Sequence, residues 1–248
     1  MKFQKRILYT FTIVSVIISL VFVFSSCNNK TKPVFFENNK ALGVDVSSHN
    51  GEIDWEKVSK TDIQYAFIRA GYRGYGEEGK ISKDELAEKN IKNALKNNLP
   101  IGVYFYSQAI TKEEAEEEAK FLLKTIKHHK IELPVVMDVE FAHDKNGEKT
   151  GRLYDAKLTA EEQTDICNSF TKIIKEHGYT PMIYSNSFIF NNNINTKNLK
   201  NDTLIWLADY NKVVTYVGKY NFRQFTKKGE VDGIDSKYVD LNYCYNSN

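Results

Sequence analysis

The sequence predicts an α/β fold: a closed, irregular (β/α) barrel of eight strands in which the later helices are reduced or missing. Its 248 residues suit an α/β barrel built as a single domain. Apolar residues make up 42% of the chain and aromatic residues 13%, which is enough material for a large core. Short β-rich runs alternate with helical patterns in the first part of the chain, and they follow one another with shorter links in the last part.

Eight runs rich in apolar, β-branched or aromatic residues are the strand candidates. They are residues 41–47, 65–70, 100–107, 133–140, 181–185, 203–208, 220–225 and 238–241. The first five are separated by helical segments, which is typical of parallel βα units. In a barrel of this kind the active site lies at the carboxyl ends of the strands, and several of these runs end in polar residues.

Helical patterns fill most connections between the first five strands. They cover residues 55–60, 82–97, 111–127 and 159–178. Two of them begin with a capping box, a threonine followed three residues later by a glutamate, at Thr111 with Glu114 and at Thr159 with Glu162. Asp54 is the expected N-cap of the first helix.

The run 133–140 ends in two carboxylates, Asp138 and Glu140. Side chains two residues apart on a strand leave the same face, and the two Cα atoms should be roughly 6.5–7 Å apart. At that distance one ionised carboxylate raises the pKa of the other, which is how proteins keep an acid protonated near neutral pH. The alternative is that the strand simply ends in solvated acids before a polar loop.

The N-terminus has the features of an export signal. Residues 1–26 contain three basic residues and then an apolar stretch, and they end in two serines directly before Cys27. This pattern resembles a bacterial lipoprotein signal, with Cys27 as the lipidated first residue, 27–40 as a polar tether and 41–248 as the exported domain. An uncleaved N-terminal anchor is the alternative, because Phe24 stands where leucine is commoner. Either way we expect a membrane-anchored protein that faces the periplasm or the cell exterior.

Charge and residue spacing exclude several kinds of partner. The formal net charge is +2 and the charged runs have mixed signs, so we expect no nucleic-acid partner. The five histidines form no two-ligand helical pair and the cysteines have no ligand-like spacing, so we expect no bound metal. Cys167 and Cys244 could pair or could stay as free buried thiols.

Two stretches between strands are predicted loops. The glycines of residues 74–79 fit a dinucleotide-binding fingerprint, but two glutamates inside it would repel a pyrophosphate and no apolar helix follows. We therefore expect no nucleotide and no other cofactor, and we expect these glycines to shape a loop over the site. Residues 143–157 are predicted to be a polar loop.

A set of short motifs follows the order of the strands. They are residues 43–51, 53–55, 67–71, 102–107, 137–140, 183–185, 206–210 and 233–242. Together they resemble the glycoside hydrolase family 25 lysozymes, which cleave bacterial peptidoglycan. The resemblance extends over about residues 42–243, and it implies that family's irregular TIM-like barrel, with β/α units first and plain strands last. Each motif is weak by itself, but the ordered set is specific.

The resemblance implies roles for four carboxylates. Glu140 matches the general acid that protonates the leaving glycosidic oxygen, so it must hold a proton at working pH. Asp138 matches its partner, which either orients the substrate's acetamido group as an internal nucleophile or positions water, and the stereochemical outcome stays open. Asp45 and Asp240 match flanking aspartates near an oxocarbenium-like transition state. Their alternative role is to close the first and last strands of the barrel by hydrogen bonding.

The resemblance also implies a sugar-binding groove around these acids. The expected substrate-binding residues are Arg69, Tyr104, Tyr106, Tyr184, Trp206, Asp209, Arg223 and Gln224. Aromatic side chains at strand ends suit the apolar faces of sugar rings, although each could instead fill the core. Arg223 stands where the family commonly has tryptophan, so a guanidinium could bind a carboxylate of muramic acid or of its peptide. Arg69 stands where many members have lysine.

We therefore expect an exported, lipid-anchored and monomeric muramidase that cleaves the β-1,4 bond between N-acetylmuramic acid and N-acetylglucosamine, with peptidoglycan strands as its partner. One alternative is a non-catalytic peptidoglycan-binding lipoprotein, but binding alone would not require four acids in one cleft. Another is a chitinase-like hydrolase of other N-acetylglucosamine polymers. Residues 132–137 lack the additional upstream aspartates that such enzymes place on this strand.

Overall fold

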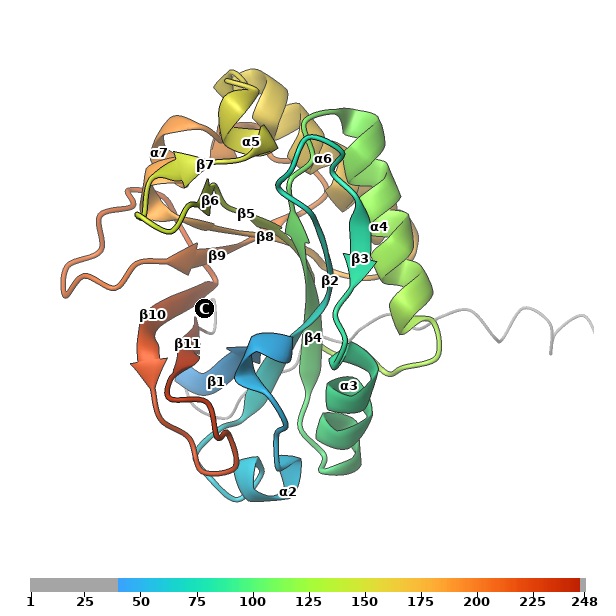
Figure 1. The fold of residues 1–248 in the computed structure, drawn as a ribbon, viewed down its shortest axis with the longest axis vertical. Coiled ribbons are helices and arrows are strands. Elements are labelled where there is room, and N and C mark those ends of the chain that lie inside the picture. Colours follow the sequence, from blue (N-terminus) through green and yellow to red (C-terminus); the bar gives the residue numbers. More distant parts are fainter. Residues whose placement is uncertain (1–39, 246–248) are drawn as a thin grey trace, which may run out of the picture. The chain divides into compact units, whose positions relative to one another are not determined.

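The computed structural model describes residues 40–245, and they form a barrel that closes between its first and second strands. The eight barrel strands are β1 (Lys40–Val46), β2 (Tyr65–Arg73), β4 (Ile101–Ser107), β5 (Val135–Val139), β8 (Pro181–Asn186), β9 (Leu204–Ala208), β10 (Phe222–Gly229) and β11 (Val239–Tyr245). Their order is β1-β11-β10-β9-β8-β5-β4-β2, and β2 pairs again with β1 (Figure 1). All eight predicted strands are confirmed, and so is the predicted α/β barrel.

Strand β11 runs antiparallel to both of its neighbours, β1 and β10. The other pairings around the described barrel are parallel. Because its direction is reversed, β11 begins at the end of the barrel where the other strands finish. Asp240, the second residue of β11, therefore lies directly opposite Asp45 of β1.

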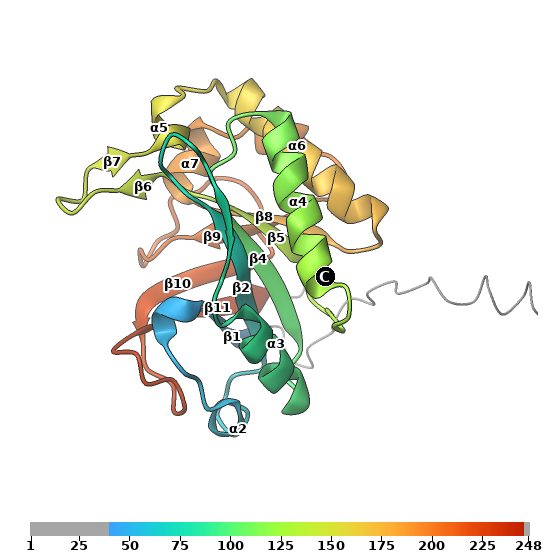
Figure 2. The same cartoon turned by 45° about the vertical axis from the view of Figure 1, so that its right-hand side comes forward.

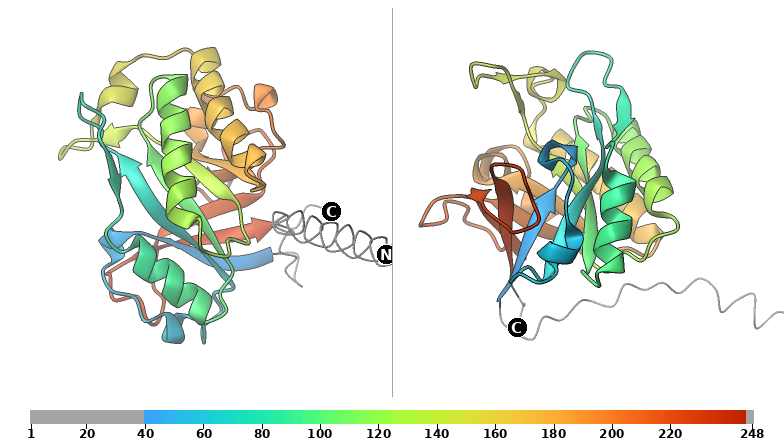
Figure 3. Two further views of the ribbon diagram at one scale, coloured as in Figure 1. Left: turned by 90° about the vertical axis from the view of Figure 1, so that its right-hand side faces the viewer. Right: turned by 60° about the horizontal axis from the view of Figure 1, so that its bottom comes forward.

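Helices lie only in the earlier connections of the described barrel. They are the 3-10 helix η1 (Ser48–Asn50), α2 (Trp55–Val58), α3 (Ala87–Lys96), α4 (Lys112–Ile126), α5 (Arg152–Asp155), α6 (Ala160–Glu176), α7 (Ser187–Asn192) and the 3-10 helix η2 (Thr196–Asn198). Helices α4 and α6 pack side by side on the outside of the barrel (Figure 3, left). Between β9 and β11 the described chain has no helix, which confirms that the later helices are missing.

The prediction of a single helix over residues 82–97 was wrong at its start. Ile81–Lys83 forms a short strand, β3, that pairs antiparallel with β2, and α3 begins only at Ala87. The buried Asp84 carboxylate accepts a hydrogen bond from the Leu86 N–H at 3.0 Å. A carboxylate that bonds its own backbone two residues on favours a turn over a helix, and this turn separates β3 from α3.

The segment 143–157 is also more ordered than predicted. It contains most of a hairpin, β6 (Ala142–His143) with β7 (Lys149–Thr150), and then the single turn α5. Figure 2 shows the hairpin extending away from the barrel. The Asp144 carboxylate accepts hydrogen bonds from the N–H groups of Asn146 and Glu148, which is a turn that aspartate favours.

The helix starts follow the predicted caps with one exception. Asp54 caps α2, and Thr159 caps α6 in a complete capping box. The Thr111 hydroxyl accepts the Glu114 N–H, but the Glu114 carboxylate does not return to Thr111. The Glu114 carboxylate accepts instead from the Ile110 backbone N–H and from the Arg152 guanidinium. The second half of this predicted box was wrong, because a charged donor from α5 takes the carboxylate.

Aromatic residues form a core cluster that joins opposite sides of the barrel and reaches the cavity. Phe67 of β2 and Trp206 of β9 stack with 4.5 Å between ring centroids, and Phe222 packs edge-on against Phe67. A Cβ atom on Gly102 would lie 2.2 Å from the Phe67 ring, so only glycine leaves room for it. The residues that contact the cavity from this cluster therefore have little freedom to move.

Both cysteines of the barrel, Cys167 and Cys244, are buried and free, so the alternative of a disulfide between them is excluded. The predicted signal sequence, Cys27 and residues 27–39 of the predicted tether lie outside the described residues. In the part of the chain that the structure describes, no helix combines the length and apolar character that crossing a bilayer requires.

Candidate active site

The carboxylates Asp45, Asp138, Glu140 and Asp240 lie together at one end of the barrel, where they line a cavity of about 280 Å³. Its other lining residues are Ser47, His49, Asn50, Arg69, Tyr104, Tyr106, Tyr184, Trp206 and Gln224. Strands β1 and β5 contribute acids at or near their carboxyl ends, and the reversed β11 contributes one near its start. The cavity therefore forms at the end of the barrel where the strand pattern predicts a site.

Asp45 is buried and held by two side-chain amides. Its Oδ2 atom accepts hydrogen bonds from Gln224 Nε2 at 2.9 Å and from Asn242 Nδ2 at 2.7 Å. The Asn242 oxygen accepts from Trp206 Nε1 at 2.8 Å, and the Gln224 oxygen accepts from two tyrosine hydroxyl groups. Because each amide oxygen is engaged by donors, each NH2 group points at Asp45. Burial raises the pKa of Asp45 to about 6, although both hydrogen bonds oppose the rise.

Asp138 is almost completely enclosed, with 5% of its surface exposed. Its Oδ1 atom has no hydrogen-bond partner among the described residues. Burial, followed by the charges of Glu140 and Asp45, raises the pKa of Asp138 well above its usual range. An unpaired buried carboxyl oxygen is costly, so this atom is suited to bind a donor from a ligand or to carry a proton.

Glu140 follows the last residue of β5 and is partly exposed. Burial raises the pKa of Glu140 to about 7, the charge of Asp45 adds to the rise, and Lys227 opposes it. A carboxyl group with this pKa is protonated in a large fraction of molecules at neutral pH, as a general acid requires. Of the pair Asp138 and Glu140, Glu140 is the more exposed, and both side chains line the cavity.

Asp240 completes the set of acids. Burial, followed by the charges of Asp45 and Glu140, raises the pKa of Asp240 to about 8, and Lys227 opposes the rise. Four carboxyl groups in one small cavity cannot all ionise at neutral pH, because each ionisation raises the cost of the next. The cavity therefore retains protons. Among the described residues, no group of three or more His, Cys, Asp or Glu side chains is arranged to hold a metal ion.

Arg69 supplies a fixed positive charge to the cavity. Its Nε atom donates to the Asp84 carboxylate at 2.8 Å, and its Nη2 atom donates to Ser48 Oγ at 3.3 Å. The Asp84 carboxylate is fully buried, so the guanidinium is held in one orientation. The Arg69 charge lowers the pKa of Asp138 and so partly offsets the effects of burial and of the other acids.

The four predicted aromatic residues all line the cavity, but they differ in exposure. Trp206 is 1% exposed and stacks inside the barrel, so it is mainly a core residue. Tyr104 and Tyr184 are buried and pack edge-on against Trp206. Tyr106 is partly exposed. Tyr104, Tyr184 and Trp206 therefore line the cavity and also belong to the core. Tyr106 is the most accessible of the four rings.

Two of the predicted binding residues do not line the cavity. The Asp209 carboxylate accepts hydrogen bonds from Ser187 and Thr215 at 2.6–2.8 Å. Arg223 donates to the backbone oxygens of Asp209 and Asn211 at 3.0 and 2.6 Å. Both side chains are therefore engaged in ordering the loop between β9 and β10. Gln224, by contrast, is at the cavity and bonded to Asp45.

Sequence reasoning missed the amide of Asn242 and a second cavity of about 700 Å³. The second cavity shares His49, Arg69 and Tyr106 with the first, and the segments that follow β2 and β5 line its other side. Asn242 lies within a recognised motif, but nothing in the sequence indicates that its amide faces Asp45. An aspartate and a glycine in the segment between β6 and β7 are turn signals that could have revealed that hairpin.

Comparisons with known proteins match most of the chain. The family model described as "Glycosyl hydrolases family 25" matches residues 44–234. The uncharacterized protein YegX of Escherichia coli (strain K12) is 29% identical over 209 residues, which are 81% of this chain and 68% of YegX.

Two solved structures are similar over most of the chain. The modular autolysin LytC from Streptococcus pneumoniae, solved in complex with a synthetic peptidoglycan ligand, aligns with a TM-score of 0.70 and 25% identity, over 86% of this chain and 48% of LytC. The chain thus spans about half of LytC. A family 25 glycosyl hydrolase from Bacillus anthracis aligns with a TM-score of 0.66 and 25% identity, over 87% of this chain and 93% of that protein.

Proposed function

Because the chain belongs to family 25 of the glycosyl hydrolases, we propose that it is a peptidoglycan hydrolase, a muramidase that cleaves the β-1,4 bond between N-acetylmuramic acid and N-acetylglucosamine. The likeness to LytC, whose structure holds a peptidoglycan ligand, supports this substrate class. The observation that carries the proposal is the cavity itself, in which four carboxylates meet and one of them, Glu140, is both partly exposed and able to hold a proton near neutral pH.

Glu140 is the proposed general acid. Its proton passes to the glycosidic oxygen as the bond between that oxygen and C1 of N-acetylmuramic acid breaks, so the N-acetylglucosamine leaves with a hydroxyl group. The positive charge that develops on the muramic ring lies among the other three carboxylates. Water then adds to C1 and releases a proton, which restores the acid.

Asp138 is the proposed partner of the acid. Its unpaired Oδ1 atom can accept the N–H of the substrate's 2-acetamido group, which would orient that group as an internal nucleophile, or it can accept from the attacking water. Both roles use the same buried atom. The proposal therefore names the residue and leaves the stereochemical outcome to experiment.

Asp45 and Asp240 are proposed to stabilise the developing positive charge. The amides of Gln224 and Asn242 donate to Asp45 and favour its ionised form, which is the form that stabilises a cationic transition state. Arg69, Tyr104, Tyr106 and Tyr184 would contact the sugar rings or their substituents. Trp206 would hold the rings of Tyr104 and Tyr184 in place through its edge-on contacts with them.

We also propose the cellular setting that the N-terminal pattern indicates. Residues 1–26 would direct export, Cys27 would carry a lipid, and residues 27–40 would tether a monomeric domain, 41–248, outside the cytoplasmic membrane. A tether of this kind raises the effective concentration of the domain at the wall.

The test is digestion of purified peptidoglycan by the full-length chain in detergent, beside Glu140→Gln and a matched control, Glu148→Gln, at an exposed position in the β6–β7 turn. Reduction and mass spectrometry identify the new sugar ends. We expect reducible N-acetylmuramic acid ends from the parent and the control, and none from Glu140→Gln. A parent that binds peptidoglycan but releases no sugar ends would instead establish the non-catalytic alternative, and ends on N-acetylglucosamine would contradict the bond assignment.

A further inference from the structure

Glu140 lies one residue beyond the last backbone pair between β4 and β5. The last pair between β4 and β5 joins Ser107 to Val139. The backbone carbonyl of Glu140 is held instead by a side chain: Gln108 Nε2 donates to it at 2.7 Å and to the Ser107 carbonyl at 2.9 Å. One amide group therefore clamps the ends of both strands at the position of the acid.

The Gln108 side chain serves as a donor only. The residue is fully buried, and its Oε1 atom has no hydrogen-bond partner among the described residues. Leaving an amide oxygen unpaired costs about 1–3 kcal/mol. Turning the amide over would set this oxygen against two carbonyl oxygens and would leave both of them without the donor. In the observed orientation the Oε1 atom of Gln108 is unpaired, and its NH2 group donates to the backbone carbonyl of Glu140.

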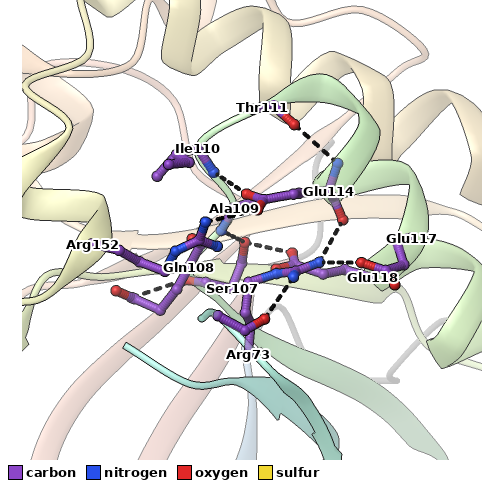
Figure 4. A network of polar contacts seen from close by, with 11 residues as sticks. Arg73, Ser107, Gln108, Ala109, Ile110, Thr111, Glu114, Glu117, Glu118 and Arg152 are labelled. Carbon is purple, nitrogen blue, oxygen red and sulfur yellow. Dashed lines mark hydrogen bonds and ion pairs between the residues drawn. The ribbon is translucent and has the colours of Figure 1, made fainter. Parts of the chain in front are cut away.

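A buried ion pair fixes the segment that carries Gln108 (Figure 4). Arg73 Nε donates to one oxygen of the Glu118 carboxylate at 2.7 Å, and Ser107 Oγ donates to the other at 2.6 Å. The Gln108 backbone also bonds to Glu118. Because Glu118 is on α4 and Arg73 is on β2, the end of β4 is anchored to two neighbouring elements.

Arg152 of α5 anchors the same segment from the other side. Its Nη1 atom donates to the Gln108 carbonyl at 3.2 Å, and its Nη2 atom donates to Glu114 at 2.7 Å. The Arg152 backbone N–H donates to the carbonyl of Tyr75, a residue that lines the second cavity, at 3.0 Å. Gln108 is therefore held on both sides.

We propose that Gln108 is a positioning residue for the acid, which it holds through the main chain of Glu140 so that the carboxyl group stays enclosed beside Asp138. This inference rests on the proposed role of Glu140. Gln108 does not line the cavity, so it acts through the backbone and without touching substrate.

The test compares full-length Gln108→Met with the parent. Methionine has a similar length and volume but no donor. Gln163→Met is the matched control, because Gln163 is a buried glutamine on α6 whose amide contacts Cys167 and none of the four acids. We expect Gln108→Met to lower kcat by about tenfold or more with KM within about twofold, since loss of indirect positioning typically costs about 10- to 100-fold. Gln163→Met should keep both values.

A second readout does not need turnover. Burial is the main cause of the raised pKa of Glu140, so an acid that is less firmly enclosed should titrate at lower pH. The charged or titratable groups that face Glu140 are Asp45, Tyr106, Asp138, Tyr184, Tyr210, Lys227 and Asp240. Neither variant changes any of them. Carboxyl ¹³C NMR of Glu140 should show a lower pKa in Gln108→Met and the parent value in Gln163→Met.

The outcomes separate this inference from the proposed function. If the parent releases sugar ends and Gln108→Met matches it in kcat and in the Glu140 titration, with only a lower Tm, then Gln108 is purely structural and the inference is overturned. If the parent itself releases no sugar ends, the proposed function fails. The NMR titration then decides about Gln108 alone, and an unchanged Glu140 pKa in Gln108→Met overturns its positioning role.

Discussion

Replacing Glu140 by glutamine should stabilise the protein at pH 8 and leave its stability unchanged at pH 4. The pKa of Glu140 is raised from 4.5 to about 7 by burial and by Asp45. Between these two values the native state keeps a proton that the unfolded chain has lost, so the free energy of unfolding falls as the pH rises. Below this window both states are protonated and there is no penalty; above it the full penalty is present. Glutamine cannot ionise and escapes the penalty.

The magnitude follows from the same two pKa values. A rise from 4.5 to about 7 corresponds to at most about 3.5 kcal/mol, at roughly 1.4 kcal/mol for each pH unit. Water reaches this partly exposed group, so we expect a gain of about 1–3 kcal/mol at pH 8. For a chain of this size each 1 kcal/mol moves Tm by roughly 2–4 °C.

The assay is urea unfolding of the parent and of Glu140→Gln at pH 4, 6 and 8. Glu148→Gln, which changes an exposed glutamate, is the control and should follow the parent at every pH. The curves of the parent and of Glu140→Gln should coincide at pH 4 and separate as the pH rises. Curves that stay parallel from pH 4 to 8 would refute the reasoning, because they would show that Glu140 ionises as easily in the native state as in the unfolded chain.

Three further predictions concern the rest of the site and the anchor. Asn242→Leu removes a hydrogen-bond donor from Asp45 and leaves the Trp206 indole N–H unpaired. We expect kcat to fall at least about tenfold and the free energy of unfolding to fall by about 2 kcal/mol, measured by turnover and by urea unfolding. An unchanged kcat would show that Asp45 needs no amide support. Asp45→Asn removes a charge that raises the pKa of Glu140, so the basic limb of the residual pH–rate profile should move to lower pH, and a move to higher pH would contradict the assignment. Cys27→Ala should weaken lysis of whole cells and leave digestion of isolated peptidoglycan unchanged. A variant that matches the parent in both assays would argue against the anchor.

The eight strands and the barrel were predictable because each strand is a short apolar run bounded by turn residues or by a helical pattern. The pair Asp138 and Glu140 was predictable for the same reason, since alternation along a strand sets which side chains share a face. The beginning of α3 was not. The helical pattern in the sequence extends back through residues 82–86. The structure shows that these residues are not helical, because the Asp84 side chain is buried and accepts a hydrogen bond from Arg69.

The groups that support the acids could not have been predicted from the chain. Gln108 and Glu140 are 32 residues apart, and Asn242 is 197 residues from Asp45. Pattern and propensity describe neighbours along the chain, whereas these hydrogen bonds depend on which strands become adjacent when the barrel closes. The same limit applies to Glu114, whose predicted capping bond is lost to Arg152, a residue 38 positions away.

The reversal of β11 reconciles the two roles that were open for Asp45 and Asp240. In an all-parallel barrel, a residue near the start of the last strand would lie at the end away from the active site. Here β11 is antiparallel to β1, so its second residue, Asp240, lies opposite Asp45 at the carboxyl ends of the other strands. Backbone groups pair β1 with β11, the Asp45 carboxylate also accepts a hydrogen bond from Asn242 of β11, and both carboxylates line the cavity. Closing the barrel and supplying the fourth carboxylate are therefore one structural event, and the proximity that results is a cause of the raised pKa of Asp240.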